Sequence, residues 1–196
     1  MPEIAAIELI APGGLASANT LENVTRDERI KAVYTFAPFG ADLTALGLPF
    51  GYWSAESFAA IDIPLFIEVG NLDDVALYET GSVAIYEGSV NSDRYLLTIL
   101  EARHNVAPNP SPPVDNAEAF LRYGEPAWDS QRLNNIAQHF VTAFMGLHLN
   151  GDDSFAPYLD LIEVASDGNP DEGTQWAGFP ARTALGMTFR SASAGE

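Results

Sequence analysis

The sequence predicts an α/β protein in which a parallel sheet is flanked by helices. Three short apolar segments, rich in β-branched and aromatic residues, are predicted strands: Ala32–Ala37, Leu65–Val69 and Tyr95–Leu100. Segments with a helical pattern lie between and after them. The chain has 196 residues, of which 47% are hydrophobic and 11% aromatic, so it can build one substantial core. We therefore expect a single domain over residues 1–196.

The three predicted strands are expected to be buried and parallel. They are apolar almost throughout, which is typical of strands covered on both faces. The second and third are joined by Val75–Glu87, whose mixed apolar face is compatible with a helix but is interrupted by Gly81. A strand, helix, strand unit of this kind places the ends of its two strands at one edge of the sheet.

The clearest predicted helix begins at Asp129 or Ser130 as N-cap and stops at Asn150-Gly151. Apolar residues recur along it with helical spacing: Leu133, Ile136, Ala137, Phe140, Val141, Phe144 and Leu147. This helix must bury one face. Its two histidines, His139 and His148, are out of register with each other, which favours polar-face or helix-end positions over a metal pair.

Two loops and one further strand are predicted in the second half of the chain. The proline-rich segment Ala107–Pro113 follows His104 directly and is interpreted as an ordered loop over a site. A second loop is predicted at Asp167–Gly173. The further strand is the short apolar tail Ala184–Phe189, which is a candidate edge strand.

Charge and cysteine content exclude several classes of function. The chain carries 27 acidic against 9 basic residues, a net charge of −18, and Lys31 is its only lysine. Such a surface repels phosphate backbones and anionic lipid headgroups, so we expect no nucleic-acid and no membrane partner. We interpret the acidity as a solubility feature. The absence of cysteine excludes disulfides, thiolate metal sites and a cysteine nucleophile.

The sequence offers no support for export or for a nucleotide cofactor. The segment Met1–Ile10 has acids where a signal peptide needs basic residues, and no apolar run approaches the roughly 18 residues of a membrane span. We therefore expect a cytoplasmic protein. Glycine-rich phosphate loops with dinucleotide or P-loop spacing do not occur, so no cofactor is expected.

Two polar residues follow the second and third predicted strands. Asp73 comes three residues after Gly70, where a turn directs its carboxylate towards the strand ends, and His104 follows the next strand. An acid followed by a histidine at the ends of adjacent parallel strands is typical of a Ser-His-Asp triad. Either residue alone could be an ordinary loop residue, but their joint placement favours the acid and base of a triad.

A metal site is the alternative interpretation of the same region. Glu101 and His104, together with Asp73 and Asp74, could supply carboxylate and imidazole ligands. The pair Glu101-x-x-His104 would share one face only on a helix, whereas here it ends a strand and precedes a proline-rich loop. We therefore expect no metal.

Several segments in order resemble the α/β-hydrolase superfamily, and specifically its dienelactone-hydrolase-like and carboxylesterase members. They are Asp27–Gly40, Val69–Val75, Asp93–Thr98, Arg103–Asn105 and Trp128–Phe140. The resemblance extends from Asp27 to Phe189 and implies the C-terminal part of that fold, with a truncated parallel sheet. It also implies that Asp73 is the triad acid, that His104 is the base, and that the helix after Asp129 packs on the sheet.

The departure from that family is the nucleophile. No Gly-x-Ser-x-Gly elbow occurs in the chain, although the family places one upstream of Arg29. Pro12-Gly13-Gly14 follows the strand-like Ile7–Ile10, but Ala11 stands where the nucleophile would be, and alanine cannot attack a carbonyl. Three loop serines are conceivable substitutes: Ser54, Ser57 and Ser111.

The sequence thus leads to two hypotheses about function. In the first, the protein hydrolyses a small carboxylic ester with His104 as general base and Asp73 to orient it, and its serine is either unusual or supplied by another chain. In the second, it is an inactive interaction protein or subunit derived from such an enzyme. The aromatic run Phe50–Trp53 could line a substrate pocket. Because the strand Ala32–Ala37 would lack one neighbour, we also expect a homo-oligomer or a complementing chain.

Overall fold

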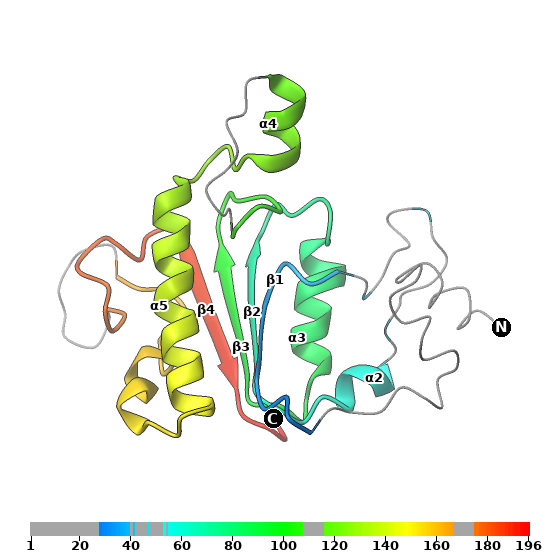
Figure 1. Ribbon diagram of the computed structural model, residues 1–196, viewed down its shortest axis with the longest axis vertical. Helices are drawn as coiled ribbons and strands as arrows, with labels where there is room; N and C mark the ends of the chain where they lie inside the picture. The colour runs from blue at the N-terminus through cyan, green and yellow to red at the C-terminus, as the bar shows by residue number, and fades with distance from the viewer. Residues whose placement is uncertain are drawn as a thin grey trace. The chain divides into compact units, whose positions relative to one another are not determined.

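The computed structural model describes residues 28–39, 41, 47, 53, 55–107, 116–166 and 175–196. The strands and helices it describes all belong to one compact unit, Lys31–Glu196. A four-stranded sheet lies between helices (Figure 1). Its strands are β1 (Val33–Phe36), β2 (Leu65–Gly70), β3 (Arg94–Ile99) and β4 (Met187–Ala192). The predicted α/β arrangement is confirmed, while residues 1–27 of the expected domain lie outside the described part.

The sheet is mostly parallel. Its strands lie in the order β1-β2-β3-β4, with the first three parallel and β4 antiparallel to β3. β2 is buried along its whole length, as expected of a central strand. The three predicted parallel strands are therefore confirmed. The C-terminal strand begins at Met187, opposite Ile99, rather than at Ala184, because a turn through Gly186 (φ +84°) precedes it.

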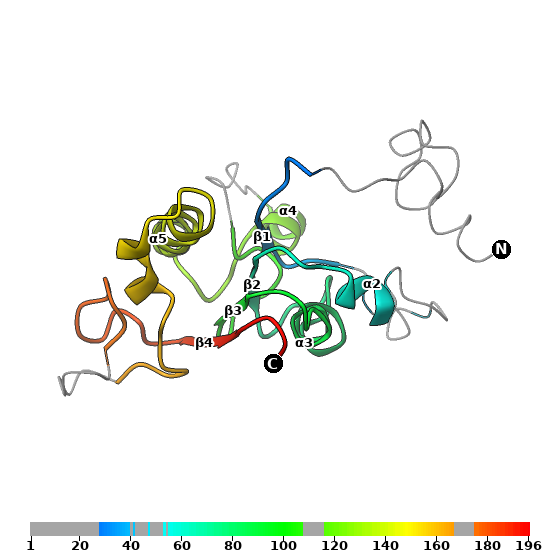
Figure 2. The same cartoon turned by 90° about the horizontal axis from the view of Figure 1, so that it is seen from below.

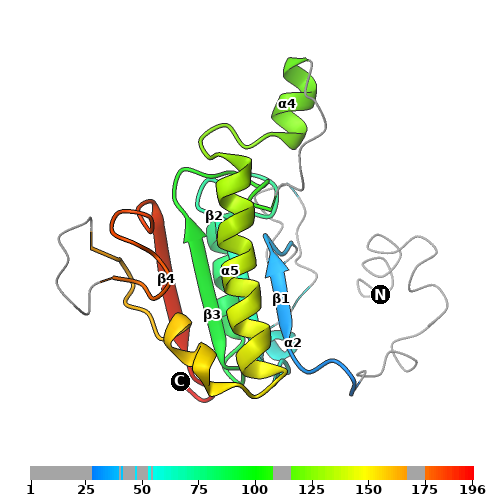
Figure 3. The same cartoon turned by 60° about the vertical axis from the view of Figure 1, so that its left-hand side comes forward.

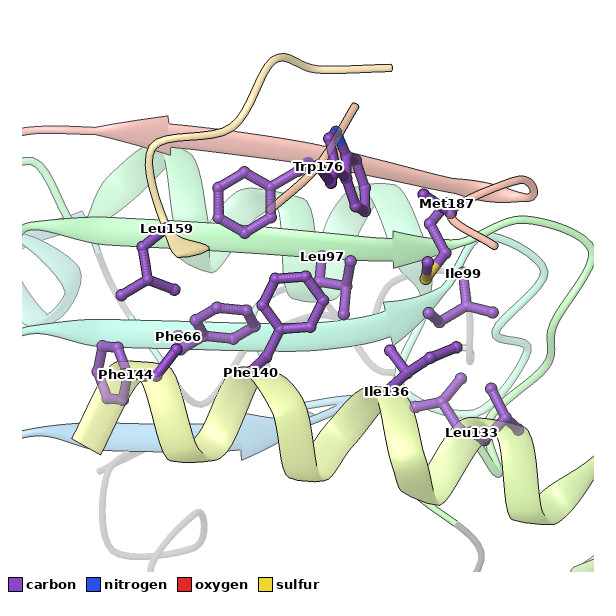
Figure 4. Close-up of a cluster of buried hydrophobic side chains, with 14 of the residues drawn as sticks. Phe66, Leu97, Ile99, Leu133, Ile136, Phe140, Phe144, Leu159, Trp176 and Met187 are labelled. Carbon is purple, nitrogen blue, oxygen red and sulfur yellow. The ribbon is translucent and has the colours of Figure 1, made fainter. Parts of the chain in front are cut away.

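Helix α5 (Ser130–His148) covers one face of the sheet (Figures 2 and 3). The predicted N-cap is confirmed, since the Asp129 side chain accepts a hydrogen bond of 2.8 Å from the backbone N–H of Arg132. Its apolar side chains pack on aromatic and aliphatic residues of the sheet (Figure 4). The best-buried members include Phe66, Leu97, Ile99, Leu133, Phe140 and Phe144. No helix among the described residues combines the length and apolarity needed to cross a membrane.

The opposite face is covered by α2 (Ala55–Ala59), the π-helical segment η4 (Tyr78–Val83) and α3 (Ala84–Gly88). Gly81 does not end the predicted helix. The N–H groups of Gly81 and Ser82 both donate to the carbonyl of Leu77, at 2.8 and 3.2 Å, which widens the turn. A Cβ at Gly81 would lie 1.9 Å from the carbonyl oxygen of Ala76, so this turn requires glycine.

Two shorter helices complete the described secondary structure. A helix, α4 (Ala117–Tyr123), precedes α5, and the 3₁₀ helix η5 (Asp153–Tyr158) follows it. The predicted loop at residues 167–173 lies outside the described residues, as does most of the proline-rich loop, from residue 108 to 113.

An acidic side chain lies in the layer between the sheet and α5. Glu68 shares the α5-facing side of β2 with Phe66, and it is fully buried. The Tyr34 hydroxyl donates a hydrogen bond of 2.6 Å to its Oε2, while Oε1 has no partner. Burial raises the pKa of Glu68 to about 8, although the Tyr34 hydrogen bond opposes that shift. Glu68 is therefore mostly a neutral carboxylic acid at pH 7.

Glu68→Gln, which imitates the neutral acid, should stabilise the protein at pH 7 to 8 and change little near pH 4. Unfolded Glu68 ionises near pH 4.5, whereas the folded state keeps its proton up to about pH 8. Wild-type stability therefore falls as pH rises between these values, by an amount on the order of 4 kcal/mol for Glu68 alone. Urea unfolding of both proteins across this range measures the difference. Exposed Glu163→Gln is the control, and parallel stability curves for wild type and Glu68→Gln would contradict the expectation.

Candidate functional site

The loops after β2 and β3 lie side by side at the carboxyl edge of the sheet (Figure 1). Asp73 follows the end of β2 and His104 follows the end of β3. The Nδ1 atom of His104 lies 3.0 Å from Oδ2 of Asp73, a hydrogen-bond distance. The predicted proximity of these two residues is confirmed.

Asp73 is held rigidly by its own turn. Its Oδ1 accepts hydrogen bonds from the backbone N–H groups of Val75 (2.9 Å) and Ala76 (2.8 Å), which leaves Oδ2 for His104. The Asp73 side chain is 0% exposed. Burial alone would raise its pKa, but the hydrogen bonds from His104, Val75 and Ala76 outweigh burial and hold the pKa of Asp73 below its ordinary value. Asp73 is thus an oriented carboxylate at neutral pH.

His104 is the more accessible member of the pair, with 36% of its side chain exposed. The hydrogen bond with Asp73 raises its pKa, burial opposes this shift, and the negative charges of Asp73 and Asp74 reinforce it. Because Nδ1 faces Asp73, Nε2 is the ring nitrogen left for a reacting group. Among the residues that the structure describes, none makes a hydrogen bond to Nε2.

Close contact between the two loops depends on Gly70. A Cβ at this position would lie 2.3 Å from the carbonyl oxygens of both Ala102 and Arg103, so any other residue would push the His104 loop away. The backbone N–H of Leu72 donates to the carbonyl of Ala102 at 2.9 Å. The Asn71 side chain accepts from the N–H of Glu101 at 2.6 Å. The loop after β2 therefore fixes the loop after β3 directly.

Sequence reasoning missed a second set of contacts to the His104 loop. The linker between α4 and α5 contains Glu125, whose carboxylate accepts from the backbone N–H of Arg103 (2.8 Å) and of Ala127 (2.9 Å). Trp128 in the same linker donates its indole N–H to the carbonyl of Leu100 at 2.7 Å. In the sequence, these residues are only an acid and a tryptophan in a short linker before an N-cap. That pattern does not indicate which loop they would contact.

The metal alternative receives no support from the geometry. Glu101 lies in a turn with φ +63°, and its backbone, not its carboxylate, contacts the neighbouring loop. Within the described ranges, no group of three or more acidic or histidine side chains is arranged to hold a metal ion. Asp74 instead pairs with Arg103 at 3.0 Å on the exposed rim of the site.

Of the three candidate substitute nucleophiles, only Ser57 is among the described residues, and it does not lie near His104. Ser57 lies in α2, at the opposite end of the sheet (Figure 1), where Asn91 just before β3 donates to the carbonyl of Ala59. It was a wrong candidate, because a helix that precedes β2 meets the amino ends of the parallel strands. Ser54, Ser111 and Ala11 lie outside the described residues.

The two histidines of α5 pack against aromatic side chains, away from the Asp73–His104 pair. His139 packs edge-on against Tyr158 and Phe179, and His148 in the last turn of α5 lies 3.1 Å from the Tyr95 hydroxyl. Burial lowers the pKa of both histidines. A hollow of about 450 Å³ lies at the amino end of β3, where it is lined by residues that include Tyr95 and His148 and not by Asp73 or His104.

The aromatic run Phe50–Trp53 falls outside the described residues except for Trp53. Its indole N–H donates to the carbonyl of Phe39 at 3.3 Å, and 49% of Trp53 is exposed. The hydrogen bond and the ring contact of Trp53, with Phe39 and Phe58, do not involve Asp73 or His104. Apolar surface nearer to Asp73 comes from Leu72 and Val75, which are 47% and 48% exposed.

Comparison with known proteins does not assign this chain to a family. Neither a scan against protein-family models nor a search of curated proteins finds a match to this chain.

Asp73→Asn should lower the pKa of His104, because it removes the charge and the hydrogen bond that raise it. A raised histidine pKa contributes stability below pH 6.5 that is lost as pH rises through the folded pKa. Asp73→Asn should therefore cost more stability near pH 5.5 than near pH 8. Imidazole NMR titration and urea unfolding measure the two effects.

Asp74→Asn is the matched control for this prediction. Asp74 acts on His104 through charge alone, as the weakest of the four causes, so its removal should lower the pKa of His104 less than Asp73→Asn does. Equal shifts in the two variants would show that the 3.0 Å bond does not set the behaviour of His104.

Proposed function

We propose that this protein is a carboxylic ester hydrolase of the α/β-hydrolase type. The observation that carries the proposal is the hydrogen bond between Asp73 and His104 at the ends of adjacent parallel strands. The order of acid and histidine along the chain is that of α/β-hydrolases, and packing of α5 on the sheet agrees with the same fold. In this proposal the sheet corresponds to the C-terminal part of the hydrolase sheet, with β4 as an antiparallel strand at its edge.

The proposed chemistry assigns a distinct role to each nitrogen of His104. Nε2 takes the proton of a serine hydroxyl as its oxygen attacks the ester carbonyl, and then gives that proton to the departing alcohol. Water, deprotonated in the same way, hydrolyses the acyl-enzyme. Nδ1 donates to Asp73, whose carboxylate stabilises the imidazolium formed in both steps. The serine is not identified in this chain, and Leu72 and Val75 offer apolar contact for a small ester.

The second candidate function is that of an inactive, hydrolase-derived interaction protein or subunit. It is favoured by the lack of a Gly-x-Ser-x-Gly elbow in the sequence. A covalent fluorophosphonate probe separates the two candidates, because it labels only an activated serine. Labelling of this chain supports the enzyme; lack of both labelling and ester turnover supports the subunit.

The edge of β1 supports a further element of the proposal, which is assembly with another chain. The N–H groups of Val33 and Ala37 donate to the β2 side, at 2.9 and 2.8 Å, so those of Tyr34 and Phe36 point to the other side. No strand among the described residues pairs there. The segment Val33–Phe36 contains neither a charge nor a proline to discourage pairing. A homo-oligomer or a complementing chain would occupy this edge.

His104→Ala should reduce hydrolysis of p-nitrophenyl acetate by about 10³-fold or more, because a general base and its nucleophile act as a unit. His148→Gln is the matched control, since His148 lies on α5 against Tyr95 and should keep near wild-type turnover. Retention of activity in His104→Ala would show that His104 is not the general base and would contradict the triad mechanism.

Sedimentation equilibrium at micromolar concentration should give a mass above the 21.1 kDa of one chain. Phe36→Lys should shift the protein towards the monomer, because a charge on an edge strand opposes pairing with a second strand. Exposed Val164→Lys provides a control away from this edge. A well-folded wild-type species that sediments as one chain would contradict the assembly proposal and leave the ester-hydrolase proposal to its own test.

A further inference from the structure

We propose that Glu125 is a positioning residue that holds His104 in place against Asp73. This inference rests on the proposed function of the Asp73–His104 pair and adds a residue from outside the two loops that carry the pair. Glu125 lies in the linker Gly124–Trp128, between α4 and α5, and is only 7% exposed.

Both carboxylate oxygens of Glu125 are used. Oε2 accepts from the N–H of Arg103, the residue immediately before His104, and Oε1 accepts from the N–H of Ala127. One side chain thereby joins the His104 loop to the linker that leads into α5. A buried carboxylate is costly unless it is paired, and two charge-assisted bonds to backbone N–H groups supply that pairing.

The linker contacts the His104 loop on both sides of the histidine. Before it, Arg103 is bound by Glu125, and after it, the Asn105 side chain donates to the carbonyl of Gly124 at 3.2 Å. Further back, the Trp128 indole binds the carbonyl of Leu100 at the end of β3. These three bonds fix the backbone from which the imidazole extends.

The linker is itself anchored to the fold. The Arg132 guanidinium lies 4.4 Å from the centroid of the Trp128 ring, and the Arg132 backbone is capped by Asp129. A Cβ at Gly186 would lie 2.8 Å from the Trp128 ring, so the turn before β4 packs closely on the indole. The linker that holds Glu125 is therefore anchored, through Trp128 and Arg132, to the first turn of α5, whose apolar face is buried on the sheet.

The loop after β2 holds the His104 loop from the other side, through Gly70, Asn71 and Leu72. Those contacts set how close the two loops approach each other. Glu125 holds the same peptide group from its other end, because the carbonyl of Ala102 accepts from Leu72 while the N–H of Arg103 donates to Glu125. Loss of this bond would let the histidine backbone move relative to Asp73 without unfolding the sheet.

The test measures His104 directly, in the full chain. Glu125→Gln keeps the size of the side chain but replaces one acceptor oxygen by an NH₂ group, so whichever way the amide turns, the bond to Arg103 or the bond to Ala127 is lost and the bridge between loop and linker is broken. We expect imidazole NMR titration to show a lower pKa for His104 than in wild type, because the Asp73 bond is weakened. Glu125→Ala should give the same change or a larger one.

Asp152→Ala is the control for general loosening. Asp152 caps η5 and contacts neither loop, so its removal should reduce stability and leave the His104 titration unchanged. An unchanged His104 titration in folded Glu125→Gln would overturn the positioning role. If Glu125→Ala does not fold, Glu125→Gln alone decides.

If the protein hydrolyses esters, Glu125→Gln should lower kcat by roughly 10 to 10²-fold and leave KM nearly unchanged, as a small misplacement of a catalytic group does. The NMR titration tests the positioning role of Glu125, and the kinetic measurement tests the proposed ester hydrolysis, so each hypothesis can be rejected without the other. A shifted His104 titration without any wild-type turnover would keep the positioning role and remove the esterase. If the wild-type protein hydrolyses esters but the His104 titration of Glu125→Gln is unshifted, the esterase proposal stands and the positioning role is rejected.

Discussion

Parallel pairing of β2 with β3, in a register that sets Gly70 opposite Ile99, brings the loops that carry Asp73 and His104 to one edge of the sheet. The crossover through η4 and α3 makes this pairing possible, since parallel strands need a long connection. Asp73 and His104 are 31 residues apart in sequence, and the register brings them to hydrogen-bond distance. The chemistry we propose and the contacts around it all depend on that edge.

The same strand leads to two buried acids with opposite electrostatic behaviour. Glu68 receives one hydrogen bond, from Tyr34, and burial dominates, so its pKa is raised to about 8. Asp73 receives two backbone hydrogen bonds and one from His104, which together outweigh burial and lower its pKa. The number of donors that each carboxylate meets decides whether it is neutral or charged. Only the charged acid can stabilise an imidazolium.

Hydrogen bonds from two neighbouring segments hold the His104 loop, and its Ala102 and Val106 are buried in the core. It lies between the turn after β2, which approaches closely because Gly70 has no side chain, and the linker before α5, where Glu125 accepts from the Arg103 N–H. In the sequence, the first of these two segments precedes β3 and the second follows it. A loop bound in this way presents its histidine at a fixed place while leaving one ring nitrogen accessible.

The sequence by itself determined the three parallel strands, the N-cap and extent of α5, and the placement of an aspartate and a histidine at successive strand ends. These follow from hydrophobic pattern and capping chemistry, which act over a few residues. Only the tertiary structure decided that Glu125 binds the loop of His104, that Ser57 lies at the wrong end of the sheet, and that Glu68 keeps its proton. Each of these depends on how distant parts of the chain are placed relative to one another, and a local sequence pattern does not encode that placement.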